Sequence, residues 1–427
     1  MLDIKLIREN PELVRDGMRR KCVDPQVVDN VLKLDEERRE LRKQTEAEQA
    51  RLNESSQKMA TASPEERETL RADLRTLSDG IQDKNNKLGE LDERFLVLMR
   101  IIPNIPDADV PDGKTDKENV VIRTEGVKRE FGFTPKDHEE LAQALDLLDM
   151  ERGVKVSGAK FYYLKNQLVI LENAVLRFAL DVLRGKGFTL MTVPNMARAD
   201  AFYGAGHFST PEDAEDGDAY RLERDNLYLV GTAEVGLVNY HADETLKEGD
   251  LPLRYAGISP CYRREAGTYG KETRGLYRVH QFNKVEMVTL VRPEDSVREH
   301  SMLLAVAEEL LTKLGLHYQV VLNCAGDLGQ PQSKKWDIET WMPGMGKYGE
   351  THSCSNDTDY QARTLNIKYR VNAQEKATAY VHTLNNTALA SPRILIALLE
   401  NYQEEDGSIT IPEVLRPYTG FDRISRA

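Results

Sequence analysis

Apolar side chains between residues 70 and 98 recur at alternating spacings of three and four, interrupted only by a lysine at 84. The series comprises Leu70, Leu74, Leu77, Ile81, Leu88, Leu91, Phe95 and Leu98. This spacing is typical of the a/d seam of a coiled coil. A weaker stripe precedes it at Leu34, Leu41, Leu52 and Met59. Between the stripes, Ser63 and Pro64 form a helix-start signal, so the pattern predicts two long helices folded back as an antiparallel hairpin.

The predicted hairpin is rich in charged residues outside its apolar seam, and Pro64 is its only proline between residues 28 and 99. Roughly 35 residues of helix at about 1.5 Å per residue make such an arm about 50 Å long. Two interpretations remain open for this segment. It is either a coiled coil that forms a dimer or a projecting arm that holds an extended ligand.

After Ile102 the pattern changes, because three prolines and alternating polar residues cannot continue a helix. We interpret residues 103–129 as a linker between an N-terminal unit, 1–102, and a second unit, 130–427. In the second unit, strand-like runs often follow one another without a helix. These runs lie at 188–194, 226–231, 251–259, 278–291, 317–324, 334–343 and 380–386. The fold class predicted is α+β, with an antiparallel sheet flanked by helices.

Composition narrows the class of protein. The chain has 427 residues and a formal net charge of −13, which argues against general adhesion to polyanions and requires local basic patches for any nucleic-acid partner. No apolar run is long enough to span a bilayer, and the N-terminus is charged too early for a secretory signal. The four cysteines are scattered, without metal-ligand spacing. We expect a cytoplasmic protein with reduced thiols and no membrane association.

The segment 261–286 carries the strongest chemical signal. Two strand-like stretches flank a long loop with three glycines and several cations, and long loops in compact domains are often functional. Arg263 and Arg278 are candidates for holding a carboxylate and a phosphate, because a planar guanidinium binds both anions with two hydrogen bonds. Taken alone, the segment fits a solvated hairpin equally well.

Several ordered motifs resemble class II aminoacyl-tRNA synthetases of the seryl type. YRREAG followed by TRGLYRVHQFNKVE (261–286) is similar to motif 2 of that class. A helix followed by GFTLMTVP (171–194) resembles motif 1, and TLNNTALASPRILIALLENYQ (near 383–402) resembles motif 3. LVGTAEV and GETHSCSN also match the seryl form, and the helical arm lies where that family keeps its tRNA-binding domain.

The resemblance implies a site for each substrate. The catalytic arginines would be Arg263, Arg278 and Arg393. Serine would be bound by Thr232, Ala233, Glu234, Arg263, Glu286, Asn385 and Thr387. ATP would be bound by Arg263, Arg264, Glu265, Arg278, Val279, Phe282, Glu350, Thr351, His352, Ser353 and Arg393. Glu350 and Ser353 would hold Mg²⁺, which suits their hard oxygen donors.

Three of these residues depart from the family pattern. Thr387 lies in NNTALASPR (385–393), where many members read NGSGLAVGR, so the hydroxyl is retained. Arg264 stands where a serine is usual, and alternation along a strand should point it away from ATP. His352 also differs, and we interpret it as a packed loop residue in preference to a neighbour of the phosphates.

The resemblance implies a homodimer that activates L-serine with ATP and transfers it to serine tRNA, held by the arm of the other subunit. Serylation of selenocysteine tRNA follows only if the host has that tRNA. One alternative is a paralogue that delivers an activated small amino acid to a carrier, which retention of the whole arm disfavours. Another is a non-catalytic coiled-coil protein on a decayed synthetase fold, which the intact Arg263, Glu286, Glu350 and Arg393 disfavour.

Overall fold

The structure is a computed structural model that describes residues 1–59, 63–265, 275–371 and 377–426. Its contacts divide the chain into two units. One comprises residues 2–19 and 23–103, and the other comprises residue 1, residues 20–22 and residues 104–427. The tip of the predicted hairpin, 60–62, and most of the glycine-rich loop, 266–274, lie outside the described residues.

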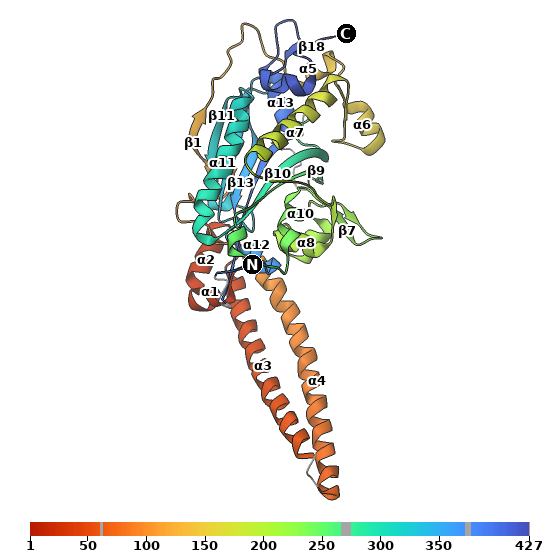
Figure 1. Cartoon of the computed structure of the whole chain (residues 1–427), viewed down its shortest axis with the longest axis vertical. Helices are drawn as coiled ribbons and strands as arrows, with labels where there is room; N and C mark the ends of the chain where they lie inside the picture. Colours follow the sequence, from red (N-terminus) through yellow and green to blue (C-terminus); the bar gives the residue numbers. More distant parts are fainter. Residues whose placement is uncertain (60–62, 266–274, 372–376, 427) are drawn as a thin grey trace. The chain divides into compact units, whose positions relative to one another are not determined.

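The first unit confirms the antiparallel helical hairpin (Figure 1). Short helices α1 (Ile4–Glu9) and α2 (Pro11–Arg20) precede α3 (Gln26–Met59) and α4 (Pro64–Ile101). Helix α4 begins as expected, because the Ser63 side chain and Glu66 form a reciprocal capping box. Leu34, Ile81, Leu88 and Leu91 are buried along the seam.

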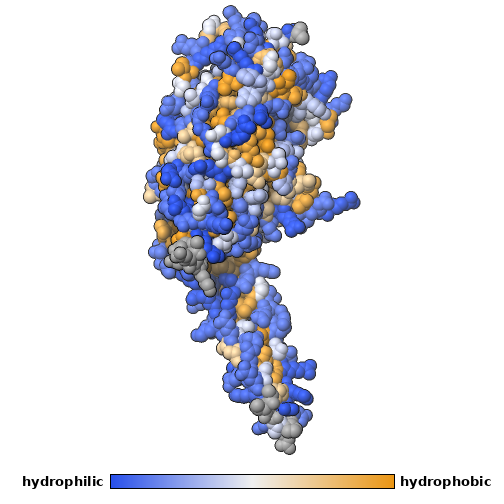
Figure 2. All heavy atoms as spheres, in the orientation of Figure 1, coloured by the Kyte–Doolittle hydropathy of each residue, from blue (hydrophilic) through white to orange (hydrophobic). Residues whose placement is uncertain are grey.

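Ion pairs join α3 and α4 beside the seam. Lys84, which interrupts the apolar series of α4, pairs with Glu48 of α3 at 2.7 Å. Arg38 Nε donates to Asp92 at 2.6 Å, and its guanidinium lies over the Phe95 ring. The face of the arm seen in Figure 2 is mainly hydrophilic. The charges outside the seam therefore face solvent or pair across the hairpin.

An eight-stranded sheet forms the centre of the second unit, in the order β1-β11-β12-β13-β16-β10-β9-β4. The strands are β1 (Val120–Glu125), β4 (Thr189–Thr192), β9 (Leu253–Tyr262), β10 (Gln281–Val291), β11 (Tyr318–Leu322), β12 (Lys334–Met342), β13 (Lys347–Asn356) and β16 (His382–Ala390). Neighbours are antiparallel except β4 and β9, which pair in parallel. The predicted antiparallel sheet is confirmed, and each strand-like run contains a strand.

Two strands of this sheet were not expected from the sequence. Strand β13 carries the segment 349–356, which has no apolar alternation. Strand β1 lies inside 103–129, the segment interpreted as a linker, and pairs with β11 at the sheet edge. The chain therefore joins the sheet before residue 130.

Three helices, α7 (Gln167–Gly185), α11 (Ser296–Lys313) and α13 (Ser391–Asn401), bury their apolar residues against the sheet. Val285, Met287 and Cys354 point into this core from the strands. Because side chains alternate along a strand, the intervening residues of β10, β13 and β16 point to the opposite face. That face carries the polar pocket described below.

Smaller elements surround the sheet. The helices are α5 (His138–Ala144), α6 (Met150–Ser157), α8 (Ala199–Ala205), α9 (Pro211–Asp216), α10 (Glu234–Val238), α12 (Tyr360–Leu365) and α14 (Arg416–Thr419). The strands are β2 (Leu148–Asp149), β3 (Tyr163–Leu164), β5 (Met196–Ala197), β6 (Arg221–Leu222), β7 (Leu227–Leu229), β8 (Thr245–Lys247), β14 (Lys368–Arg370), β15 (Thr378–Tyr380), β17 (Ile409–Thr410) and β18 (Arg423–Ile424). Within the described residues, none of the helices combines the length and apolar character needed to cross a bilayer.

Candidate active site

A pocket on the polar face of the sheet brings together 15 of the 17 residues expected to bind serine or ATP. They are Thr232, Glu234, Arg263, Glu265, Arg278, Val279, Phe282, Glu286, Glu350, Thr351, His352, Ser353, Asn385, Thr387 and Arg393. Ala233 and Arg264 do not line it: Ala233 is fully buried, and Arg264 is exposed but lies beyond the end of β9, so strand alternation is not the reason. Residues from four separate motifs thus share one cavity.

A β-bulge in β13 aligns Glu350 with Ser353. Ile338 pairs with His352 and Glu339 pairs with Glu350, so Thr351 is an extra residue on β13. Residues three apart on a regular strand would point to opposite faces, but one extra residue restores the same face. Glu350 and Ser353 therefore both face the pocket, although the plain alternation rule forbids it.

A second bulge, in β16, sets the amino-acid end of the pocket. Glu286 pairs directly with Thr387 across the ladder, and Ala388 is the extra residue. Directly opposed residues of an antiparallel pair present their side chains on the same face. The carboxylate of Glu286 and the hydroxyl of Thr387 consequently line the same wall, as expected from the motifs.

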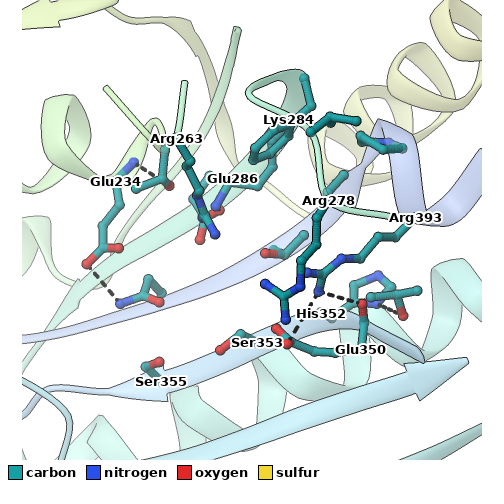
Figure 3. Close-up of a pocket in the computed structure, with 18 of the residues that line it drawn as sticks. Glu234, Arg263, Arg278, Lys284, Glu286, Glu350, His352, Ser353, Ser355 and Arg393 are labelled. Atoms are coloured by element: carbon teal, nitrogen blue, oxygen red, sulfur yellow. Dashed lines mark hydrogen bonds and ion pairs between the residues drawn. The ribbon is translucent and has the colours of Figure 1, made fainter. Parts of the chain in front are cut away.

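Glu234 lies at one end of the pocket in Figure 3, at the start of α10. Its Oε1 accepts hydrogen bonds from Gln361 at 2.8 Å and Asn385 at 3.2 Å, and its Oε2 lies 3.4 Å from His207 Nε2. Burial alone would raise the pKa of Glu234, but the hydrogen bonds and the His207 ring hold it below its usual value. This carboxylate is therefore ionised and fixed in direction.

Arg263 lies in the middle of the pocket, just after β9. Its Nε donates to the Gly231 carbonyl at 3.3 Å, and its guanidinium carbon lies 5.4 Å from the centre of the Phe282 ring. A guanidinium held by one nitrogen keeps its other donors available for an anion. Arg263 is placed to face both ends of the cavity.

Arg278, Arg393 and Glu350 lie at the other end of the pocket (Figure 3), and Glu265 also lines the cavity. Arg278 Nη1 lies 3.2 Å from Glu265 Oε2. Arg393 Nη1 donates to the Glu350 carbonyl at 2.9 Å and lies 3.3 Å from its Oε2. Arg393 belongs to the first turn of α13, where the positive end of the helix dipole adds to its charge. This end of the cavity suits a polyanion.

The Glu350 carboxylate remains a strong acceptor in this setting. Burial would raise its pKa, but Arg393, Lys335 and Arg263 hold the pKa below its usual value. Its side chain is 46% exposed toward the cavity. Glu350 is therefore ionised and accessible to a cation.

His352 lies in β13 and not in a loop, and both of its ring nitrogens have partners. Nδ1 is 2.9 Å from Thr351 Oγ1, and Nε2 is 2.9 Å from the Ala388 carbonyl. Burial lowers its pKa to about 4, so the ring is neutral at physiological pH. His352 therefore braces β13 against β16 and adds no positive charge to the pocket.

Several pocket residues were not identified from the sequence, namely His207, Tyr277, Lys284, Gln332, Ser355, Ala390 and Pro392. Lys284 and Ser355 lie two positions from identified residues on the same strands, so alternation could have found them. His207 and Gln332 lie outside the named helices and strands, and no periodic pattern marks them. Gln332 donates to Ser355 Oγ at 2.8 Å.

Family comparisons define the class to which this fold and pocket belong. Residues 220–402 match the family model of the class II tRNA synthetase core domain (G, H, P, S and T). Residues 1–106 match the model of the seryl-tRNA synthetase N-terminal domain. The catalytic unit is thus that of a class II aminoacyl-tRNA synthetase.

Individual relatives narrow the assignment. The serine–tRNA ligase of Dictyoglomus thermophilum is 46% identical over 99% of each chain. The crystal structure of seryl-tRNA synthetase from Pyrococcus horikoshii complexed with ATP superposes with a TM-score of 0.91, at 43% identity and full coverage of both chains. The cytoplasmic serine–tRNA ligase of Naegleria fowleri in complex with AMP gives 0.86 at 30% identity, covering 100% of this chain and 99% of that one. The chain belongs to the seryl-tRNA synthetase family.

Proposed function

We propose that the chain is a serine–tRNA ligase, which activates L-serine with ATP and transfers the seryl group to serine tRNA. The observation that carries this proposal is the division of one pocket into an acidic, hydroxyl-bearing end and an arginine-rich end, with Arg263 between them. An amino acid and a nucleoside triphosphate need these opposite environments side by side. The full-length match to serine–tRNA ligases supports the same function.

In the activation step, a serine carboxylate oxygen attacks the α-phosphorus of ATP. A new bond forms between that oxygen and the α-phosphorus. The bond between the α-phosphorus and the oxygen that bridges it to the β-phosphorus breaks, and pyrophosphate leaves with the electron pair. The step needs no protein nucleophile, because position and positive field are sufficient. Arg263 would neutralise the two approaching anions, and its hold on the Gly231 carbonyl fixes it in advance of the reaction.

ATP would lie toward Arg278 and Arg393. Phe282 offers an aromatic face beside Arg263 for the adenine ring, and the Val279 backbone borders the same space. Glu265 would accept from the adenine amino group. The β- and γ-phosphates would meet Arg278 and Arg393.

The donor set of the pocket fits Mg²⁺. Glu350 and Ser353 provide a carboxylate and a hydroxyl on one face. Among the described residues, there is no cluster of three or more His, Cys, Asp or Glu that could hold a metal ion. Magnesium is commonly held by one or two carboxylates together with substrate phosphates. When bound, it would neutralise charge on the phosphate oxygens, while Arg393 holds Glu350 in place.

Serine selection would take place at the opposite end. Glu234, with Thr232 and Asn385 beside it, would bind the ammonium group, and Glu286 and Thr387 would bind the hydroxyl. A buried site that hydrogen-bonds a substrate hydroxyl rejects an analogue without it, because the protein groups are left without a partner. Alanine would therefore be rejected because it leaves these groups without a partner, whereas rejecting threonine requires only a tight wall around the hydroxyl.

We also propose that α3 and α4 bind the tRNA and that the enzyme is a cytoplasmic homodimer in which each arm serves the partner's site. Residues 104–427 carry 38 Lys and Arg against 49 Asp and Glu, which makes the catalytic unit an unsuitable surface for a polyanion. The arm instead exposes arginines on helices long enough to follow an extended ligand.

Pyrophosphate exchange across a panel of amino acids, with and without serine tRNA, tests the proposal. Exchange should occur with serine, and tRNA should then be charged. Exchange with serine but no charging of any tRNA would favour the carrier-delivery alternative, and no exchange at all would favour the non-catalytic one. Glu350→Gln provides an inactive control, since it removes the proposed ligand charge with little change in shape.

A further inference from the structure

Lys284 lies in the amino-acid end of the pocket without a role in the assignments above. It is two residues before Glu286 on β10, so the two side chains share a face. Its ammonium forms an ion pair with Glu286 Oε2. The Lys284 side chain is 8% exposed and that of Glu286 is 3% exposed. A lysine buried to this degree requires a compensating anion, and Glu286 supplies it.

The residues around Lys284 leave Glu286 as its ion-pair partner. The residues opposite it in the ladder are Ser259 on β9 and Ala390 on β16, neither of which is charged. Glu286 is the one carboxylate that forms a described ion pair with Lys284. The other nearby cation, Arg263, is held at the Gly231 carbonyl and beside Phe282. Lys284 therefore interacts with Glu286, whereas Arg263 interacts with the Gly231 carbonyl and lies beside Phe282.

Glu286 lies in an environment that opposes its ionisation. Burial raises its pKa above the usual value, and the charge of Glu234 on α10 adds to this effect. Lys284 on its own strand and Arg263 after β9 act in the opposite direction. The other titratable groups around it are the thiols of Cys261 on β9 and Cys354 on β13, whose pKa values burial raises, so both are neutral. Lys284 is thus the adjacent group that favours the carboxylate form.

We infer that Lys284 is a positioning residue for serine selection, which keeps Glu286 ionised and oriented to accept a hydrogen bond from the substrate hydroxyl. The inference rests on the proposed function, because it assumes that Glu286 meets that hydroxyl. A carboxylate forms a hydrogen bond with a hydroxyl that is roughly twice as strong as a neutral pair. Lys284 would therefore act on the choice of amino acid through Glu286, without contacting the reacting atoms.

Serine binding should depend on pH because Lys284 lowers the pKa of Glu286. Without the ammonium, the pKa of Glu286 rises further, so a larger fraction of the carboxyl is protonated at a given pH and accepts poorly. Raising the pH restores the carboxylate and with it the hydrogen bond to serine. A neighbouring opposite charge shifts a carboxyl pKa by about 1 to 3 units, so losing it should change the ionisation equilibrium of Glu286 by about tenfold or more.

Steady-state pyrophosphate exchange by Lys284→Met between pH 6.5 and 9 tests the inference. The KM for serine should rise about tenfold or more at pH 7, and the defect should shrink as the pH rises. The KM for ATP and the weak exchange with alanine should change much less, because neither involves Glu286. Lys284→Arg should restore part of the serine affinity at pH 7, because it keeps the positive charge.

Arg254→Met is the matched control. Arg254 on β9 holds another buried carboxylate, Glu299, through hydrogen bonds of 2.6 and 2.8 Å, outside the pocket. Removing this cation should lower the unfolding temperature without adding a pH dependence to serine KM. If Lys284→Met does not fold, Lys284→Gln is measured in its place, with the same expectation.

The outcomes separate this inference from the proposed function. Equal, pH-independent losses with serine and alanine in Lys284→Met would overturn the inference and place Lys284 with the carboxylate- or phosphate-binding groups. A Glu286→Gln variant with an unchanged serine-to-alanine ratio would overturn the assignment of Glu286 instead. Wild-type protein that exchanges no pyrophosphate with serine would overturn the proposed function itself.

Discussion

The arm and the catalytic pocket both depend on charged residues, but they use them in opposite ways. On the arm, Lys58 and Glu54 pair with both side chains 65% exposed, and water screens the interaction. In the pocket, the carboxylates of Glu234 and Glu286 are buried and depend on specific partners. Exposed charge on the arm is thus interchangeable in position, whereas each charge in the pocket is fixed by its neighbours.

This difference indicates which charged residues can be substituted with little effect. An exposed charge contributes mainly to the field that a polyanion meets, so its exact position matters little. A buried charge that loses its partner leaves the other group uncompensated, which is costly. Four experiments test this contrast, and they are arranged from the largest expected effect to the smallest.

Shortening the arm should have the largest effect. Replacing residues 43–88 with a short turn keeps the base of the hairpin, including the contact of Arg38 with Asp92. Binding of serine tRNA should weaken by more than about a hundredfold, because the phosphate contacts are lost, while serine-dependent pyrophosphate exchange stays within about twofold. Filter binding at several salt concentrations measures the first quantity. Unimpaired charging by the shortened enzyme would contradict a tRNA-binding arm.

Arg263→Lys should reduce the rate of adenylate formation by about a hundredfold, since a lysine cannot reproduce the planar pair of donors. Single-turnover measurement of adenylate formation gives this rate directly. Arg221→Lys is the matched control, because Arg221 also lies near an aromatic ring, that of Tyr228, but outside the pocket. Near-normal rates in Arg263→Lys would remove Arg263 from the activation step.

Thr387→Val should lower serine activation by about 1 to 2 kcal/mol, or roughly 5- to 30-fold, through the loss of one hydrogen bond. Activation of alanine should change far less. Thr289→Val is the control, because the Thr289 hydroxyl is buried on β10 and has no hydrogen-bond partner among the residues that the structure describes. Comparing kcat/KM for the two amino acids measures the effect, and equal losses would exclude Thr387 from hydroxyl recognition.

Glu54→Gln on the arm should have the smallest effect, with no measurable change in the unfolding midpoint. Glu299→Gln is the contrasting variant, since Glu299 is buried and holds Arg254 with two hydrogen bonds. It should destabilise the protein clearly, because the arginine loses its charged partner. Thermal unfolding at low and high salt compares the two, and similar shifts would contradict the contrast between exposed and buried charge.

The sequence predicted those features that depend on local pattern. Heptad spacing placed α3 and α4, and the Ser63–Pro64 signal placed the start of α4. Motif residues identified most of the pocket. Strand β13 was missed because its pocket face is polar, and periodicity detects only strands with an apolar face. Strand β1 was missed because proline-rich sequence precedes it and its valines are half-exposed at the sheet edge.

Other features depend on long-range contact and leave no local signal. His207 and Gln332 reach the pocket from irregular segments, and only the fold brings them there. The hydrogen bond from Gln361 to Glu234 joins residues 127 positions apart. The neutral, fully partnered state of His352 likewise follows from its burial between β13 and β16, and not from its neighbours in sequence.

The bulges at Thr351 and Ala388 also determine how the length of these strands can change. Deleting the extra residue itself would leave a regular strand, in which the flanking residues keep their partners and Glu350 and Ser353 still share a face. A one-residue deletion elsewhere in β13 or β16 would instead exchange inward and outward side chains beyond the deletion. An alignment of these segments should therefore accept a one-residue gap at Thr351 or Ala388 and treat a gap at other positions of the two strands as a change of function.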